Sequence, residues 1–166
     1  MYQWFEAKIK YDKTGDDGVI KTVTEAYLVD AMSFTEAEKR ITLEMQPFIK
    51  GDFLISALKR MKIAEIVEAE WSINAVDAES NKILGNKINQ SETADTWYMC
   101  KVNFVTLDEE KGVEKKQPSY MLVHANSTRT ANDTLLQHLK TTMADYEVEK
   151  VAETKILDVF HYTAVA

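Results

Sequence analysis

Apolar and polar residues alternate over residues 4–11 and again over residues 97–104. A period of two predicts a β-strand with one buried face. A polar stretch, DKTGDDG at residues 12–18, follows the first strand, and the apolar pattern then resumes over residues 20–31. We therefore expect a hairpin with residues 20–31 as its return strand. The buried face is predicted to carry Phe5, Ala7, Ile9 and Tyr11 in the first stretch and Tyr98, Cys100, Val102 and Phe104 in the second.

The return strand is followed by a helical pattern. The sequence SFTE at Ser33 has the form of a capping box, in which Ser33 and Glu36 satisfy each other's backbone donors. A second helix is expected after Ser127, where Thr130 replaces the glutamate. Two short strands follow the first helix, near residues 53–60 and 63–70. The apolar stripes expected at helical spacing are Phe34, Ala37, Ile41 and Met45 in the first helix and Ala131, Leu135 and Leu139 in the second.

The chain contains this whole pattern twice. Setting Trp4 on Trp97 places WFEAKIKY over WYMCKVNF, and LVDAMSFTEAEKRI then falls over LVHANSTRTANDTL. The agreement spans roughly 60 positions, with gaps only in loops, as expected of an internal repeat. We therefore predict an α+β fold that duplicates a β-β-α-β-β unit, with two antiparallel sheets, one helix on each, in a pseudo-twofold arrangement. The expected division is a first repeat at 1–73, a polar linker at 74–95 and a second repeat at 96–166.

Each helix can cover only one face of its sheet. The opposite face is too apolar to be left in water as one patch. We expect the two faces to pack on each other within the chain, and a homodimer that buries the same surface is the alternative. The residues expected on these faces are Trp4, Ala26 and Leu28 in the first repeat and Trp97, Met99, Tyr120 and Leu122 in the second.

Composition narrows the class of protein. The chain has 166 residues, of which 45% are hydrophobic and 28% charged, and this balance is typical of a soluble domain with a core. The formal net charge of −7 disfavours non-specific attraction to phosphate backbones. One cysteine excludes an internal disulfide and a cysteine-based zinc cluster. No apolar run reaches the roughly 20 residues that span a bilayer, and the N-terminus lacks a signal-peptide layout, so we expect a cytoplasmic protein without a membrane segment.

Candidate chemistry is sparse. The sequence contains no phosphate loop, nucleophile elbow, metal-ligand spacing or calcium loop, so no catalytic residue, metal or cofactor is predicted. Cys100 matches Ala7 in the repeat and is expected to be a small core residue, while His138 is expected at the surface and His161 has no motif around it. Asp30 and His124 hold equivalent places where a strand ends and a helix begins. An acid–base pair formed by these two is the less favoured interpretation.

The repeats diverge most at this strand-to-helix corner. Asp30, Met32, Phe34 and Thr35 in the first copy become His124, Asn126, Thr128 and Arg129 in the second. An acidic, apolar corner is thus replaced by a polar, basic one that can donate hydrogen bonds. We predict that any ligand or partner site in the second copy includes His124, Asn126 and Arg129. Drift on a solvated corner is the alternative.

The phrases WFEAKIKY, VTEAYLVDAMSFTEAEKRI, WYMCKVNFVTLDEEKGVEKK and MADYEVEKVAETKILDVF resemble the family called domain of unknown function 4494. The resemblance covers roughly residues 4–160 and so includes both repeats. It implies a protein of Bacteroidota or of their phages and mobile elements. It implies no activity, cofactor or site residue.

Three binding functions compete, and an enzyme whose site is not visible in a single sequence is the fourth, less favoured hypothesis. The leading hypothesis is a small non-catalytic binding protein, such as a phage or mobile-element accessory or an inhibitor of a host protein. The second is a single-stranded nucleic-acid binding protein, in which bases stack on exposed aromatic side chains. The third is capture of a small anionic, nucleotide-like ligand at a helix N-terminus. The expected stacking residues in the second hypothesis are Trp4, Trp97, Tyr98 and Tyr120.

Overall fold

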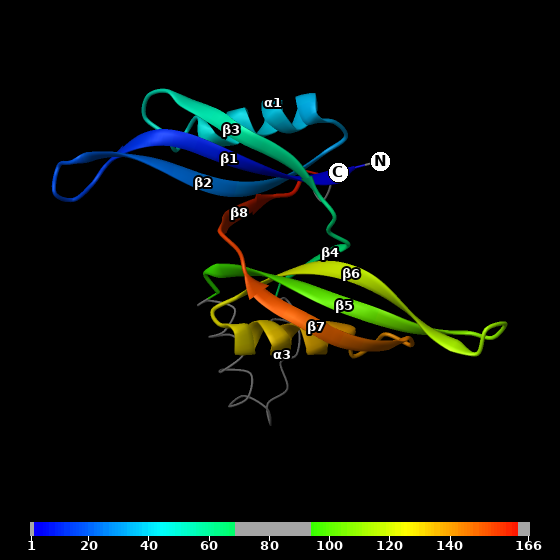
Figure 1. Ribbon diagram of the computed structural model, residues 1–166. Helices are drawn as coiled ribbons and strands as arrows, with labels where there is room; N and C mark the ends of the chain where they lie inside the picture. Colours follow the sequence, from blue (N-terminus) through cyan, green and yellow to red (C-terminus); the bar gives the residue numbers. More distant parts are fainter. Residues whose placement is uncertain (1, 69–93, 163–166) are drawn as a thin grey trace, which may run out of the picture. The chain divides into compact units, whose positions relative to one another are not determined.

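A computed structural model describes residues 2–68 and 94–162 of the chain. The chain divides into two compact units, each built on its own sheet (Figure 1). Unit 1 comprises residues 1–62 and 155–166, and unit 2 comprises residues 63–154. The linker expected at 74–95 falls almost wholly on residues 69–93, which lie outside the described residues. Neither described helix is long and apolar enough to cross a membrane.

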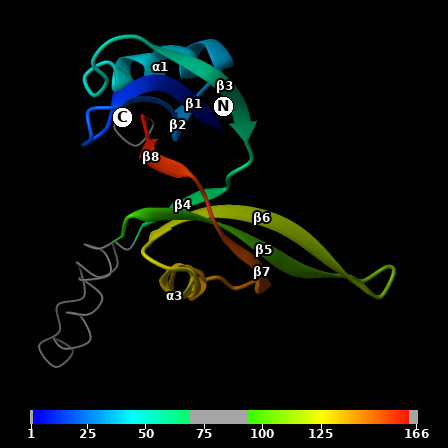
Figure 2. The ribbon, with the colours of Figure 1, turned by 60° about the vertical axis from the view of Figure 1, so that its left-hand side comes forward.

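Unit 1 is a four-stranded sheet with one helix on one face. Its strands run in the order β3-β1-β2-β8. The hairpin of β1 and β2 is antiparallel, and β3 pairs antiparallel with the other side of β1. Figure 2 shows helix α1 lying over one face of this sheet. The elements are β1 (Gln3–Thr14), β2 (Ile20–Ala31), α1 (Phe34–Met45), β3 (Phe53–Met61) and β8 (Ile156–Phe160).

Unit 2 repeats this architecture. Its strands run in the order β4-β6-β5-β7, and helix α3 covers one face of the sheet. The hairpin of β5 and β6 is antiparallel, as is the pairing of β5 with β7. The elements are β4 (Glu65–Val67), β5 (Thr96–Asp108), β6 (Val113–Ala125), α3 (Thr128–Leu139) and β7 (Asp145–Glu153).

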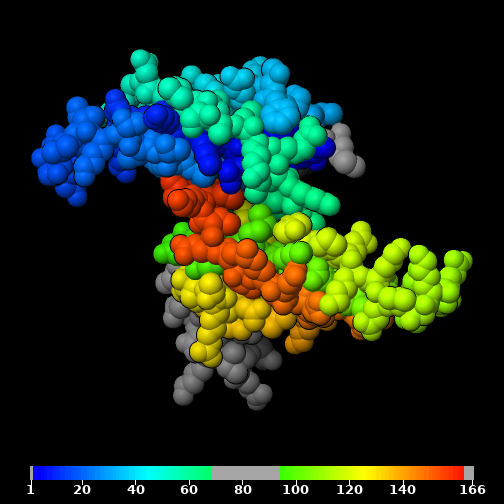
Figure 3. Space-filling view, in the orientation of Figure 1, coloured from blue at the N-terminus to red at the C-terminus, as the bar shows by residue number. Residues whose placement is uncertain are grey.

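The two repeats exchange their last strands. Strand β4 belongs to the first repeat, yet it pairs with β6 of unit 2. Strand β8 belongs to the second repeat, yet it pairs with β2 of unit 1. In Figure 3 the red spheres of β8 lie against the blue spheres of unit 1. Each sheet is therefore completed by a strand from the other half of the sequence.

This exchange refines the predicted fold. The α+β class and the duplicated β-β-α-β-β unit are confirmed. The sheets differ from the expectation in two respects. Each fourth strand comes from the other repeat, and it runs parallel to its neighbour, so each sheet is mixed rather than wholly antiparallel. A strand that enters from the other repeat is free to pair in either direction, whereas a strand that follows a tight turn must pair antiparallel.

Matching irregularities support the common origin of the units. The pairing of β1 with β3 shifts register between Lys8 and Ile9, and that of β5 with β7 shifts between Lys101 and Val102. Both hairpin turns also place a glycine at positive φ, with φ of 77° at Gly18 and 62° at Gly112. A side chain at such a φ is strained, so both turns favour glycine.

Each unit has its own core between helix and sheet. In unit 1 the fully buried Phe5, Ala7 and Ile9 pack with the Ala37, Ile41 and Met45 stripe of α1, as predicted. In unit 2, Cys100 and Val102 pack with the corresponding α3 side chains, and Val67 of β4 joins them. The core of unit 2 thus includes a side chain from the first repeat. Phe34 is 46% exposed and lies at the margin of the predicted stripe, where its ring meets that of Phe5 edge-on.

Candidate functional site

The strand-to-helix corners are the candidate sites, and the two corners cap their helices differently. At α1 the Ser33 hydroxyl accepts a hydrogen bond from the Glu36 N–H at 3.2 Å. The Glu36 carboxylate accepts from the Met32 N–H at 3.3 Å and contacts Arg40, so the reciprocal bond to Ser33 that the capping box predicted is replaced. A cation four residues along the helix attracts the carboxylate away from the cap.

The complete capping box occurs at α3 instead. The Ser127 hydroxyl accepts from the Thr130 N–H at 3.1 Å, and the Thr130 hydroxyl accepts from the Ser127 N–H at 3.0 Å. The sequence lacks the usual glutamate at this position. A threonine hydroxyl reaches the same backbone donor, which is why the substitution preserves the cap.

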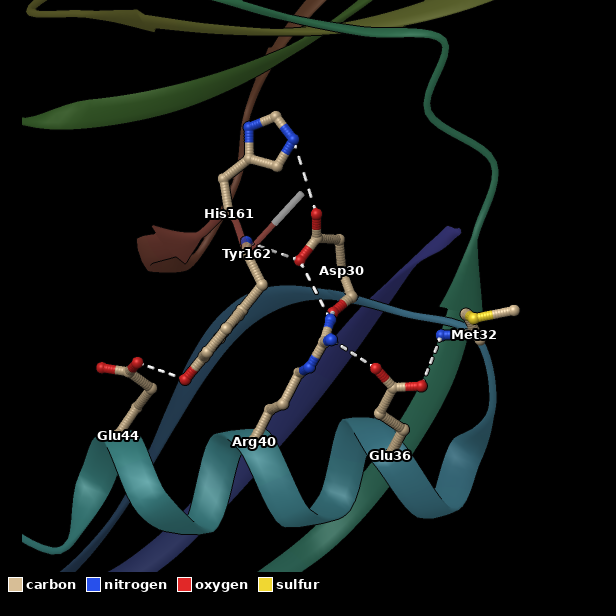
Figure 4. Close-up of polar contacts among 7 residues, drawn as sticks. All are labelled: Asp30, Met32, Glu36, Arg40, Glu44, His161 and Tyr162. Carbon is tan, nitrogen blue, oxygen red and sulfur yellow. Dashed lines mark hydrogen bonds and ion pairs between the residues drawn. The ribbon is translucent and has the colours of Figure 1, made fainter. Parts of the chain in front are cut away.

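The first corner encloses a buried carboxylate, Asp30, at the end of β2 (Figure 4). The Asp30 side chain is only 3% exposed. Arg40 Nη1 lies 3.5 Å from Asp30 Oδ1 and donates to the Asp30 carbonyl at 2.6 Å. The Tyr162 N–H donates to Oδ1 at 2.8 Å, and His161 Nε2 lies 3.4 Å from Oδ2. Ion pairing and hydrogen bonds offset the desolvation of this charge, as a buried carboxylate requires.

Arg40 is the centre of this cluster. Its guanidinium lies 5.4 Å from the ring centroid of Tyr2 and 4.6 Å from that of Tyr162, at cation–π distance from both. It also forms an ion pair with Glu36. The Tyr162 hydroxyl donates to Glu44, and burial together with this bond raises the pKa of Tyr162 to about 12. The cluster therefore ties the segment that follows β8 to α1 and β2.

Within unit 1, the histidine beside the Asp30 carboxylate is His161. The His161 ring packs on Trp4 with 4.9 Å between centroids, and its side chain is 44% exposed. The sequence showed no motif around His161, because its contact with Asp30 arises only when β8 joins β2. An aspartate that orients a histidine is half of an acid–base arrangement. Here the same aspartate is also neutralised by Arg40, which is typical of a structural ion pair.

The second corner holds the predicted residues His124, Asn126 and Arg129. The His124 ring stacks on Trp97 with 4.2 Å between centroids and 9° between planes. Asn126 is exposed, and its Oδ1 accepts from the Thr130 hydroxyl at 2.7 Å. Arg129 is exposed in the first turn of α3. The three residues follow one another along a single corner, so the structure brings them to the same region of unit 2.

The two corners also differ in the helix residue that occupies the position of Arg40. Thr134 holds in α3 the place that Arg40 holds in α1, and it is buried with 4% exposure. The buried polar residues of the described chain are Asp30, Asn103 and Thr134, so the second corner has a neutral threonine where the first has an ion pair. Its cation, Arg129, instead lies on the surface.

The aromatic residues expected to stack bases are placed unequally. Tyr98 is 5% exposed and belongs to the core of unit 2, so a base cannot stack on it without opening that core. Trp97 is 3% exposed beneath His124. Trp4 and Tyr120 are half-buried. Two of the four expected platform residues are therefore covered.

Several other ionisable groups form surface pairs, and one lies in the core. Lys101 contacts Glu149 at 2.7 Å and Lys116 contacts Glu147 at 2.8 Å. These lysines lower the pKa of both glutamates. Burial raises the pKa of the Cys100 thiol to about 11, consistent with the expected core role. Among the described residues no group of three or more His, Cys, Asp or Glu side chains could hold a metal ion.

Fold and corners together define a class: a duplicated α+β protein whose repeats exchange strands and whose two helix corners have diverged. The model of the family Domain of unknown function (DUF4494) matches residues 3–162. The chain therefore belongs to this family, as its sequence phrases indicated. A search of curated proteins found no match to the chain.

Proposed function

We propose that the chain is a non-catalytic binding protein that contacts a protein partner through the second corner, formed by His124, Asn126 and Arg129. The observation that carries this proposal is the difference between the two corners. In the first corner the charged groups are turned inward, where Asp30 and Arg40 bind each other. In the second corner the cation is exposed on a helix of the same fold. An exposed arginine with neighbouring hydrogen-bond donors suits a partner that presents carboxylates.

The direction of the pKa shifts supports a non-catalytic role. The pKa values of the Cys100 thiol and the Tyr162 hydroxyl are raised and that of the Glu147 carboxyl is lowered, in each case away from neutrality. A general acid or base works best when its pKa lies near the operating pH. These groups are therefore set for structure rather than for proton transfer.

The family resemblance supplies the biological setting of the proposal. We propose that the protein acts in the cytoplasm of Bacteroidota cells and is encoded by the cell or by one of its phages or mobile elements. Its role there is an accessory to a phage or mobile element, or an inhibitor of a host protein. An acidic partner surface is the chemical requirement that the second corner adds.

The test compares three full-length baits in a pull-down from a Bacteroidota lysate, followed by calorimetry with the purified partner. The site variant is H124F/N126A/R129A, in which phenylalanine keeps an aromatic ring on Trp97. The matched control is M32A/T35A, which changes the positions equivalent to Asn126 and Arg129 at the first corner. A partner should bind wild type and control equally and bind the site variant at least about tenfold more weakly, which corresponds to about 1.4 kcal/mol.

Three outcomes would count against the proposal. Equal affinity of a well-folded site variant for the partner would remove the corner from the interface. Robust turnover in a panel of hydrolase and transferase substrates would reject the non-catalytic role. Salt-sensitive binding of a labelled single-stranded oligonucleotide would favour the nucleic-acid alternative instead.

A further inference from the structure

The exchanged strands β4 and β8 carry the same sequence pattern. Residues 62–67 read KIAEIV and residues 155–160 read KILDVF. Each begins with Lys-Ile, continues through an acidic residue and ends on two apolar residues. The two segments hold equivalent places in the repeat, so their agreement indicates a shared structural task.

The two strands also bind their acceptors in the same register. Glu65, Ile66 and Val67 pair with Met121, Leu122 and Val123. Asp158, Val159 and Phe160 pair with Tyr27, Leu28 and Val29, which hold the equivalent places in the first repeat. In both acceptors the paired segment is the apolar end of the return strand. Each edge thus recognises a short parallel strand through backbone pairing and apolar side chains.

In each case the connection into the exchanged strand is short. Strand β3 ends at Met61 and β4 begins at Glu65, while β7 ends at Glu153 and β8 begins at Ile156. Each exchanged strand is therefore held by its pairing with the acceptor strand and by a connection of only a few residues to the preceding strand. A strand of the same sequence from another molecule presents the same pairing groups.

We propose that the edges of β2 and β6 are acceptor sites for a second copy of this chain, which fills them with its own β8 or β4 in a strand-swapped dimer. The swapped dimer repeats every contact of the exchanged strand and differs only in the connecting residues. Domain swapping is for this reason a low-cost route to a dimer. The dimer is symmetric, since each copy donates the strand that it receives.

We expect folded molecules to exchange their β8 strands slowly. Releasing β8 uncovers Ile156, which is 3% exposed, and detaches His161 and Tyr162 from Asp30. The proportion of swapped dimer is therefore set while the chain folds, when a second copy competes with the chain's own strand. A higher protein concentration during refolding raises that proportion.

The test traps the swapped pairing by a disulfide between full-length chains in a C100A background, where alanine matches Ala7 of the first repeat. Ala26 and Ile156 are direct partners across β2 and β8. One chain carries A26C and the other I156C, and the two are unfolded together, refolded and oxidised. Neighbouring strands bring paired residues within the range of a disulfide. Covalent dimer should form and its yield should rise with protein concentration.

Three controls decide the result. The double variant A26C/I156C should oxidise within one chain, which shows that the position is competent. The pair A26C and K39C, whose second cysteine lies on the exposed side of α1, measures random collision. The same two chains mixed without unfolding should give little dimer. The true pair should exceed the collision control several times over.

Two results would overturn the proposal. One is absence of covalent dimer at every concentration while the double variant oxidises within one chain. The other is a yield no higher than that of the collision control. If I156C prevents folding, the pair E65C and M121C, which are direct partners across β4 and β6, gives the same decision in unit 2. Light scattering on the refolded wild-type chain measures the dimer independently.

Discussion

Replacing Arg40 with methionine should be one of the most damaging single changes at the surface of α1. Methionine and arginine have similar helix propensities, so the change removes the guanidinium while leaving the helix intact. Asp30 then keeps its charge at 3% side-chain exposure, and its carbonyl loses the donor at 2.6 Å. Breaking a buried ion pair from one side costs about 3–5 kcal/mol, so a large effect is expected.

The expected cost for R40M lies at the lower end of that range, at about 3 kcal/mol. The Asp30 carboxylate retains the Tyr162 N–H at 2.8 Å and His161 at 3.4 Å, which limit the loss. Arg40 itself is 17% exposed, so part of its charge was already solvated. The double variant D30N/R40M should be less damaging than the sum of the single variants, with a coupling energy of about 2 kcal/mol.

The assay is urea unfolding followed by far-UV circular dichroism, with K39M as the matched control. Lys39 neighbours Arg40 on the same helix and is exposed, so K39M should change the free energy of unfolding by less than about 0.5 kcal/mol. If R40M costs no more than K39M, then Asp30 is not a buried charge held by Arg40. An additive double variant would equally refute the pairing.

Three further predictions test other parts of the fold. Thr130→Val should cost about 1 kcal/mol in urea unfolding because the α3 cap loses its hydroxyl, while exposed Thr128→Val should cost little. Val67→Ala should cost about 2 kcal/mol and speed hydrogen exchange in α3, since Val67 lies in the core of unit 2; unchanged exchange would contradict the strand exchange. The hydrogen bond to Glu25, with burial, raises the pKa of Tyr11 to about 12 from 10.0. Its contribution to stability is thus complete below about pH 10 and is lost as the pH rises toward 12, so thermal unfolding of Tyr11→Phe should depend less steeply on pH in that window.

The sequence predicted the elements of each unit because local patterns determine them. Alternation at Phe5, Ala7 and Ile9 and helical spacing at Ala37 and Ile41 reflect burial on one face, and burial on one face is what the structure shows. The repeat strengthened each assignment, since the same pattern had to explain two segments. Cys100 was placed in the core by the alternation of its strand and by its match with Ala7.

The sequence pattern placed each fourth strand in the sheet of its own repeat, whereas the structure pairs it with the return strand of the other repeat. The segments KIAEIV and KILDVF read as strands in either arrangement, because strand pattern depends on burial and not on the identity of the neighbouring strand. The contact of His161 with Asp30 depends on this pairing and was missed with it.

The corners show how a duplicated chain can reassign a position without changing its fold. Where the first repeat has Asp30 it also has Arg40, and where the second has His124 it has Thr134. In each repeat the two residues suit each other. The buried Asp30 carboxylate needs a cation beside it, whereas His124, which stacks on Trp97, needs none. A single exchange, such as Asp30→His alone, would leave Arg40 without its carboxylate. The residue that suits one position therefore depends on the residue at the other. Arg129 lies exposed in the first turn of α3, at the position that Thr35 holds in α1, and this exposed cation is the physical basis for seeking the partner surface at the second corner.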